Sequence, residues 1–302
     1  GLTFLFLYNI CTGVFTALGD SRTPLYFLIA SSLANIVMDV VFVVCFHMGV
    51  GGVAWATFLC QGVASVLAAW TLFRRLRGVP APERHPLFSW RMLGRIARIA
   101  VPSILQQSFI SVGNLFIQSL VNSFGSAVVA GYSAAVKLNT FALTGFTTLG
   151  NGLSSFTAQN IGAGRPERVK QGFRAGAGMT LCVAVPFIAG PQMVRLFLSA
   201  PSADALAQGT LFLNIVAPFY VLISLKLAAD GVLRGAGCMG QFMTATFTDL
   251  ILRVILAFLL APRFGAAGIW MSWPLGWAVA AALSLGFYFT GGWRKRVGSI
   301  DK

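Results

Sequence analysis

Residues 23–45 read TPLYFLIASSLANIVMDVVFVVC, an apolar run whose only charge is the carboxylate of Asp39. A helix of about 20 apolar residues crosses the ~30 Å hydrocarbon core of a bilayer. The run therefore predicts a membrane-spanning helix. The whole chain agrees, because 57% of its 302 residues are hydrophobic and only 10% are charged. An acid inside such a helix is costly, which makes Asp39 a functional candidate.

Eight further apolar segments of similar length are separated by short polar turns. The nine predicted spans are 1–18, 23–45, 51–73, 93–122, 127–152, 173–198, 205–233, 241–261 and 266–291. A transmembrane β-barrel would need strands of about 10 residues with alternating polarity, whereas these segments are apolar on every face. We therefore predict an all-α polytopic membrane protein with nine transmembrane helices.

The positive charge, +14 in total, comes mainly from alternate loops. The basic stretches are 74–98, 165–174 and 294–296, whereas the turns at 46–50, 123–126, 199–204 and 262–265 hold one arginine and one aspartate. Cytoplasmic loops carry an excess of lysine and arginine, so we predict that Gly1 lies outside and Lys302 in the cytoplasm. The charge thus indicates a multi-pass protein of the cell membrane and no nucleic-acid partner.

Part of the sequence repeats. The stretch GVFTALG at 13–19 aligns with GVLRGAG at 231–237, an offset of 218, and GVGGV at 49–53 aligns with GAAGI at 265–269. Spans one to three therefore recur as spans seven to nine in the same direction, which predicts two homologous bundles in a parallel repeat. If each lobe has six helices, three more spans precede residue 1.

The repeat predicts four parts of the chain. They are the second half of an N-terminal lobe at 1–73, a basic cytoplasmic linker at 74–91, a complete six-helix C-terminal lobe at 92–293 and a cytoplasmic tail at 294–302.

Five stretches carry a family resemblance. They are LYNICTGVFTALGDSRTPLYFLIASSLANIVMDVVF, MGVGGVAWAT, PSILQQSFISVGNLFIQSLVNSFG, AQNIGAGRPERVKQG and GVLRGAG. In this order they resemble the multidrug and toxic compound extrusion (MATE) family of cation-coupled efflux transporters. The resemblance implies the last nine of twelve helices, in two six-helix bundles around a central cavity.

Three polar residues of the first lobe can meet. Asn35 and Asp39 share one helix face, and Asp39 and Thr57 each lie about 9 Å inside the same end of adjacent antiparallel spans. A carboxylate in a low-dielectric site can take up a proton reversibly, and amide and hydroxyl oxygens suit sodium. We therefore predict a site for H⁺ or Na⁺ centred on Asp39, with no other metal and no cofactor. The alternative is that Asp39 only bridges helices.

The resemblance supports the ion site, because one branch of the family has an acid-centred cation site whose Asn, Asp and Thr fall on Asn35, Asp39 and Thr57. That branch has a further asparagine where this chain has Thr12. Asn9, one turn away, is the candidate to replace it.

The second lobe has lost these groups. The positions that match Thr12, Asn35, Asp39 and Thr57 hold Asp230, Arg253, Ala257 and Trp273. Because buried charges need partners, we predict a structural ion pair between Asp230 and Arg253, with Asp249 as a second acceptor.

The central cavity is expected to have polar lining from the first two helices of the second lobe. The candidates are Gln106, Gln107, Asn114, Lys137 and Asn139. Lys137 could instead extend to the membrane interface or pair locally.

We therefore predict a monomeric antiporter that exports small amphipathic or drug-like molecules by alternating access as H⁺ or Na⁺ enters, with the lipid bilayer around it. A flippase for lipid-linked saccharides is the alternative within transport. An intramembrane enzyme is disfavoured, because there is no HExxH motif and the two histidines, His47 and His85, lie in loops. A passive channel would not explain why the acid is present in one lobe only.

Overall fold

The computed structural model describes residues 1–78, 88–188 and 203–296. Regular secondary structure in these ranges is helical throughout, and the chain forms two compact units, Gly1–Phe88 and Ser89–Lys302. The boundary between the units lies within the predicted linker, between the end of one long helix at Leu76 and the start of the next at Trp90. The predicted part of span six beyond residue 188 lies outside the described residues, as does the tail after residue 296.

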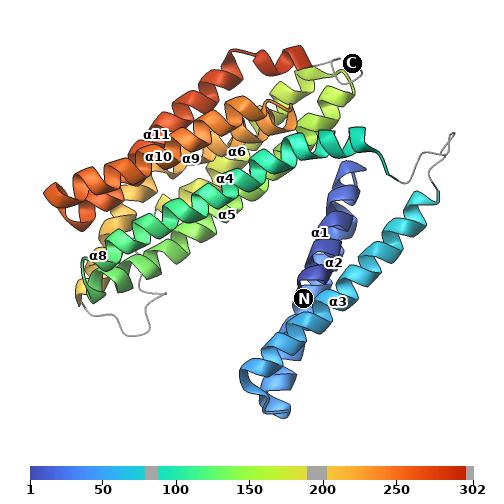
Figure 1. The fold of residues 1–302 in the computed structure, drawn as a ribbon, viewed down its shortest axis with the longest axis horizontal. Helices are drawn as coiled ribbons and strands as arrows, with labels where there is room; N and C mark the ends of the chain where they lie inside the picture. The colour runs from blue at the N-terminus through green and yellow to red at the C-terminus, as the bar shows by residue number, and fades with distance from the viewer. Residues whose placement is uncertain (79–87, 189–202, 297–302) are drawn as a thin grey trace. The chain divides into compact units, whose positions relative to one another are not determined.

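The first unit consists of three helices, α1 (Leu2–Ala17), α2 (Arg22–Val40) and α3 (Gly49–Leu76). A short π-helical segment, Val41–Cys45, continues α2. The long helix α3 packs against both α1 and α2 (Figure 1). A small core cluster of Cys11, Phe15, Ala68 and Leu72 joins α1 to α3.

The second unit holds seven α-helices among its described residues. They are α4 (Trp90–Asn122), α5 (Ser126–Gly162), α6 (Pro166–Ile188), α8 (Ala203–Val216), α9 (Tyr220–Gly235), α10 (Met239–Phe264) and α11 (Ala266–Phe289). Helix α5 packs against α6, α8 and α9, while α11 packs against α9 and α10, and α4 lies along α10 (Figure 1). The core is rich in aromatic rings, among them the fully buried Tyr220, Trp270 and Trp277.

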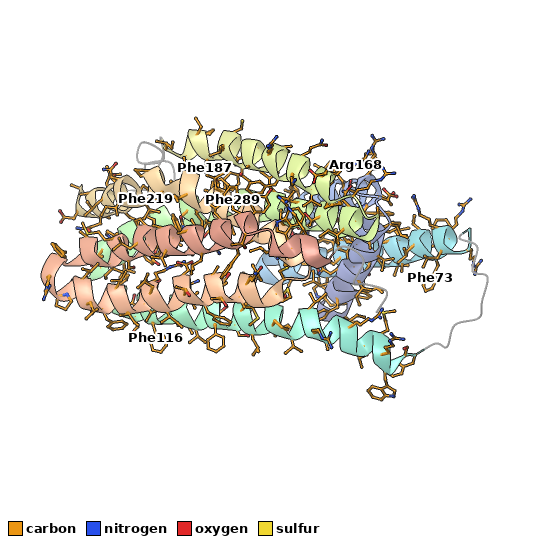
Figure 2. The ribbon with its side chains drawn as sticks, turned by 90° about the horizontal axis from the view of Figure 1, so that it is seen from above. Phe73, Phe116, Arg168, Phe187, Phe219 and Phe289 are labelled. Atoms are coloured by element: carbon orange, nitrogen blue, oxygen red, sulfur yellow. The ribbon has the colours of Figure 1, made fainter. Side chains whose placement is uncertain are left out.

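The helices agree with an all-α polytopic membrane fold. Six described segments are long and apolar enough to cross a bilayer: Arg22–Cys45, Gly49–Leu76, Trp90–Asn122, Ala203–Gly235, Met239–Phe264 and Ala266–Phe289. Large apolar side chains face outward, for example Phe116, which is 53% exposed and points away from α4 (Figure 2). Such an apolar surface suits lipid tails and not water.

Some predicted boundaries were wrong. Helix α5 ends at Gly162 and not at 152, and α6 begins at Pro166 and not at 173, because both helices continue beyond their apolar parts. The predicted span 205–233 is a pair of helices, α8 and α9, joined by the 3₁₀ turn Ala217–Phe219. Pro218 lies in this turn and has no N–H to continue the α-helical bonding.

The helix ends at the repeated glycines have the same backbone geometry. Gly19 after α1 and Gly237 after α9 both have positive φ, 81° and 71°. In each turn the residue after the glycine donates its N–H to the carbonyl five positions earlier, at 2.9 Å and 2.8 Å respectively. This is the Schellman arrangement that ends a helix at a glycine. The turn after α5 contains Gly164, and the next residue, Arg165, donates its N–H to the Asn160 carbonyl in the same way, at 2.8 Å.

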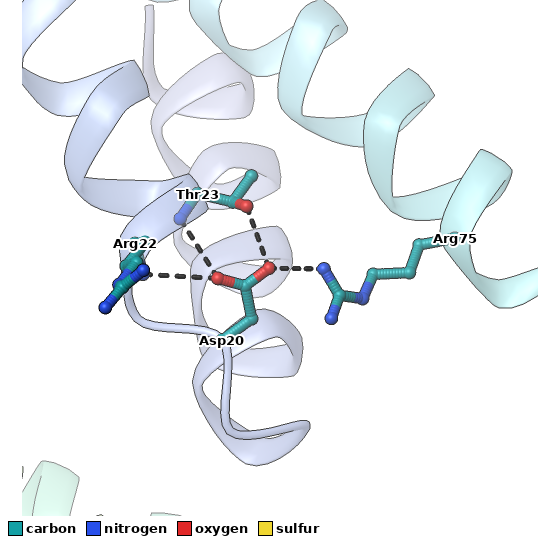
Figure 3. A network of polar contacts seen from close by, with 4 residues as sticks. All are labelled: Asp20, Arg22, Thr23 and Arg75. Carbon is teal, nitrogen blue, oxygen red and sulfur yellow. Dashed lines mark hydrogen bonds and ion pairs between the residues drawn. The ribbon is translucent and has the colours of Figure 1, made fainter.

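Asp20 fixes the turn between α1 and α2 against the end of α3. Its carboxylate accepts bonds from the backbone N–H groups of Arg22 and Thr23 and from the hydroxyl of Thr23 (Figure 3). The guanidinium of Arg75 lies 2.5 Å from the same carboxylate. The bonds from Thr23, followed by the charge of Arg75, hold the pKa of Asp20 below its ordinary value.

Candidate functional site

The predicted ion site of the first unit is partly assembled. The Asn35 Nδ2 atom donates to the Thr57 Oγ1 atom at 3.5 Å, which joins α2 to α3. Both residues line a pocket of about 200 Å³ between the three helices of this unit. The structure therefore brings together two of the three groups that the sequence placed at matched depth.

Asp39 lies one turn beyond Asn35 on α2, on the same helix face. It is half-buried, and its Oδ1 atom is buried without a hydrogen-bond partner in the part of the chain that the structure describes. Directly after it, the helix widens into the π-helical segment Val41–Cys45, a feature that is frequent at functional sites. A buried carboxylate oxygen with a free lone pair is suited to bind a proton or a small cation.

The two other predicted ion-site residues lie apart from this pocket. The Asn9 side chain is exposed and donates to the Leu5 carbonyl of its own helix at 2.9 Å. Neither Asn9 nor Thr12 lines the pocket. The face of α1 that reaches the pocket is that of Leu5 and Tyr8.

The sequence analysis did not identify Ser31 and Gln61, which line the same pocket. Their spacing is a usable signal. Ser31 is four residues before Asn35 on α2, and Gln61 is four residues after Thr57 on α3, so each extends a polar stripe along an otherwise apolar helix.

The second unit encloses a larger cavity of about 690 Å³. The amides predicted to line a cavity are there: Gln106, Gln107 and Asn114 from α4 and Asn139 from α5. Asn139 accepts a hydrogen bond from the Tyr220 hydroxyl at 3.1 Å. Lys137 is exposed and does not line this cavity. The reason is helical geometry, because residues two apart on a helix point in different directions.

The predicted ion pair between Asp230 and Arg253 is wrong, because each of these residues pairs with a different side chain. Asp230 pairs with Lys226 at 2.7 Å, and Arg253 pairs with Asp249 at 2.6 Å. Both pairs have i, i+4 spacing within a single helix, which brings their side chains together more readily than a contact between helices. The role of Asp249 as an acceptor for Arg253 is as predicted.

Lys226 is the functional candidate that the sequence analysis missed in this unit. Its side chain is 4% exposed, and its ammonium lies 3.5 Å from the Thr246 hydroxyl. The other oxygen of Asp230 accepts a bond from the Ser284 hydroxyl at 2.6 Å. The signal was a lysine in an apolar span, four residues before an aspartate.

Arg234 occupies the last turn of α9, where it also lines the cavity. Its guanidinium donates to the side-chain oxygen of Asn151 and lies over the ring of Phe242. The cavity lining therefore holds three cations, Lys226, Arg234 and Arg253, and two acids.

Comparisons with known proteins show which family this chain resembles. The MatE family model matches residues 102–259. The probable multidrug resistance protein YpnP of Bacillus subtilis is 31% identical over 300 residues, which are 97% of this chain and 66% of that protein. The probable multidrug resistance protein YoeA of the same species is 25% identical, over 95% of this chain and 65% of that protein. This chain thus spans slightly less than two thirds of the length of these relatives.

A crystal structure of a point mutant of the MATE transporter VcmN of Vibrio cholerae has the same fold, with a TM-score of 0.84 at 20% identity, over 95% of this chain and 67% of that one. The MatE match covers more than half of this chain. Together with the similarity to YpnP along 97% of its residues, the match shows that the chain belongs to the MATE family of transporters.

Proposed function

We propose that the protein is a cation-coupled exporter that releases small amphipathic molecules as H⁺ or Na⁺ enters. The observation that carries the proposal is the unpartnered, buried Oδ1 atom of Asp39, one turn from the contact between Asn35 and Thr57. Members of this family are transporters and not enzymes, which is consistent with a site for a coupling ion.

The ion acts by reversible binding. With Asp39 charged, a proton or sodium ion neutralises the carboxylate, while the Asn35 and Thr57 oxygens are further hard ligands for sodium. A transporter couples two movements when the ion and the substrate favour different states. We therefore assign the coupling ion to the first unit and the exported molecule to the cavity of the second unit.

The charges of the loops and the names of the relatives support the proposed membrane orientation and transport role. The basic ends of α3 and α9, the basic start of α6 and the arginine at position 294 would face the cytoplasm of a cell membrane, and the protein would act as a monomer. The names of the relatives refer to multidrug resistance, so the alternative of a saccharide flippase gains no support from them.

The test is the substitution Asp39→Asn in the protein expressed from its complete coding sequence. Vesicles are loaded with a fluorescent amphipathic dye, and an inward proton or sodium gradient is imposed. We expect insertion to be normal and gradient-driven efflux to be lost, because the amide keeps the shape but cannot exchange a charge. Asp204→Asn, at an exposed acid in the first turn of α8, is the matched control. Wild-type efflux in inserted Asp39→Asn protein would contradict the proposal.

A further inference from the structure

The lining of the second-unit cavity includes buried polar atoms that have no hydrogen-bond partner among the described residues. These are Asp249 Oδ1, Arg253 Nε and Trp273 Nε1. The three residues line the cavity, and they are 5%, 8% and 5% exposed. Buried polar groups are almost always hydrogen-bonded, so this set indicates a place where another molecule supplies the missing bonds.

The oxygen in this set lies close to the backbone of another helix. A side-chain carbon added at Gly276 would lie 2.5 Å from Asp249 Oδ1, so the backbone of α11 already covers that oxygen. The other oxygen of Asp249 accepts the bond from the Arg253 guanidinium at 2.6 Å. The free N–H groups of Arg253 and Trp273 remain, and both require an acceptor.

These two donors belong to side chains in contact. The guanidinium carbon of Arg253 lies 4.5 Å from the centre of the Trp273 ring, within range of a cation–π interaction. One oxygen-bearing group can therefore meet both side chains. A guanidinium with an adjacent neutral donor is well suited to a carboxylate, sulfonate or phosphate.

The charge of the cavity favours an anion as well. Lys226 and Arg253 each have an acid partner, but the side-chain partner of Arg234 is the neutral amide of Asn151. The three cations and two acids of the lining give a net charge of +1. In a low-dielectric cavity a net charge has a larger effect than it has in water.

Aromatic rings complete the site. Trp273 and Trp277 are neighbours, with ring centres 5.9 Å apart, and both line the cavity together with Tyr132. We propose that the second-unit cavity selects amphipathic molecules with an anionic group, which binds at Arg253 and Trp273 while the flat apolar part lies along Trp277. This proposal rests on the assignment of the substrate to this cavity.

The test measures binding at equilibrium, with no ion gradient. The purified full chain is placed in phosphatidylcholine nanodiscs and titrated by calorimetry with 2-naphthalenesulfonate and with the 2-naphthyltrimethylammonium cation. We expect the sulfonate to bind at least about tenfold more tightly, because it can accept charge-assisted hydrogen bonds. Equal or tighter binding of the cation would overturn the proposal. Since Asp39 and the gradient play no part in this measurement, its failure would leave the export proposal standing.

Three variants locate the anion. Asp249→Asn removes the competing carboxylate and should tighten sulfonate binding. The double variant Asp249→Asn with Arg253→Gln, which leaves no unpaired charge, should lose the preference for the sulfonate. Trp273→Phe keeps a ring but lacks the N–H, and should weaken sulfonate binding several-fold.

Arg168→Gln, at an exposed arginine of α6 (Figure 2), is the control and should bind both probes as the wild type does. A folded double variant that retained the wild-type preference would contradict the assignment to Arg253, whatever the other variants did.

Discussion

The Lys226 ammonium lies 2.7 Å from the Asp230 carboxylate one turn further along α9, with both side chains at most 5% exposed. Asp230→Asn would leave a buried ammonium without its counter-charge, a change that typically costs about 3–5 kcal/mol. We expect a strong loss of folded protein in detergent, measured as the monodisperse fraction on size exclusion.

The partner variant makes this prediction specific. Lys226→Met added to Asp230→Asn should restore much of the yield, because no uncompensated charge then remains. Arg253→Gln added instead should restore nothing, since Arg253 pairs with Asp249. Rescue by Arg253→Gln but not by Lys226→Met would mean that the pairing described above is wrong.

The Asp20 network predicts a stability change that depends on pH. The pKa of Asp20 is below its ordinary value, so its contribution is present above that ordinary value and is lost as the pH falls through the lowered pKa. We expect Asp20→Ala to lower the melting temperature near pH 7, and the difference from the wild type to shrink as the pH falls below the ordinary pKa of aspartate. Melting curves across this range test the prediction.

A comparison of two variants separates the causes of the Asp20 effect. The bonds from Thr23 lower the pKa of Asp20 more than the charge of Arg75 does. Arg75→Gln should therefore lower the melting temperature less than Asp20→Ala. Equal losses in the two variants would show that the ion pair, and not the turn, is the main contribution.

The crossing of α5 and α9 depends on glycine. A side-chain carbon at Gly231 would lie 2.4 Å from the Gly150 carbonyl oxygen, and backbone cannot yield as a flexible side chain can. We expect Gly231→Ala to destabilise the second unit despite the better helix propensity of alanine. Gly178→Ala on α6, where no atom of the described residues lies within 4 Å of the added carbon, should be neutral or slightly stabilising. Equal melting temperatures for the two variants would contradict the close packing.

The sequence was most informative where one physical rule decides the structure. Apolar runs predicted the helices, because a bilayer requires segments of that length. The repeated glycines Gly19 and Gly237 predicted two equivalent turns, and the structure has matching hydrogen bonds in both. The same reasoning did not predict the polar ends of α5 and α6, because hydropathy reports the apolar part of a helix and not its full length.

The ion-pair partners of the buried charges were harder to predict from the sequence than the burial of these charges. The sequence indicated that Asp230 and Arg253 are buried charges in need of partners, and both are buried. It did not indicate which charges pair, because a repeat offset relates positions in two lobes and not side chains within one. Attention to i, i+4 spacing would have identified Lys226 for Asp230. Likewise Lys137 lies two residues from the cavity-lining Asn139 and on another face of α5.

The last prediction separates Thr57 from Asn9 in the proposed ion site. The Thr57 hydroxyl accepts from Asn35, whereas Asn9 is exposed and bonded to its own helix. Thr57→Val keeps the shape of the side chain but removes the oxygen. We expect efflux to persist at a saturating concentration of the coupling ion. The ion concentration needed for half-maximal efflux should rise about tenfold, because one charge-assisted bond is lost. Asn9→Ala should leave this requirement unchanged. The measurement is dye efflux at increasing sodium or proton concentration, in vesicles with equal amounts of inserted protein. If Thr57→Val needs no more coupling ion than the wild type, Thr57 is not part of the site. If Asn9→Ala needs more, then α1 supplies a ligand to the ion although the Asn9 side chain is exposed.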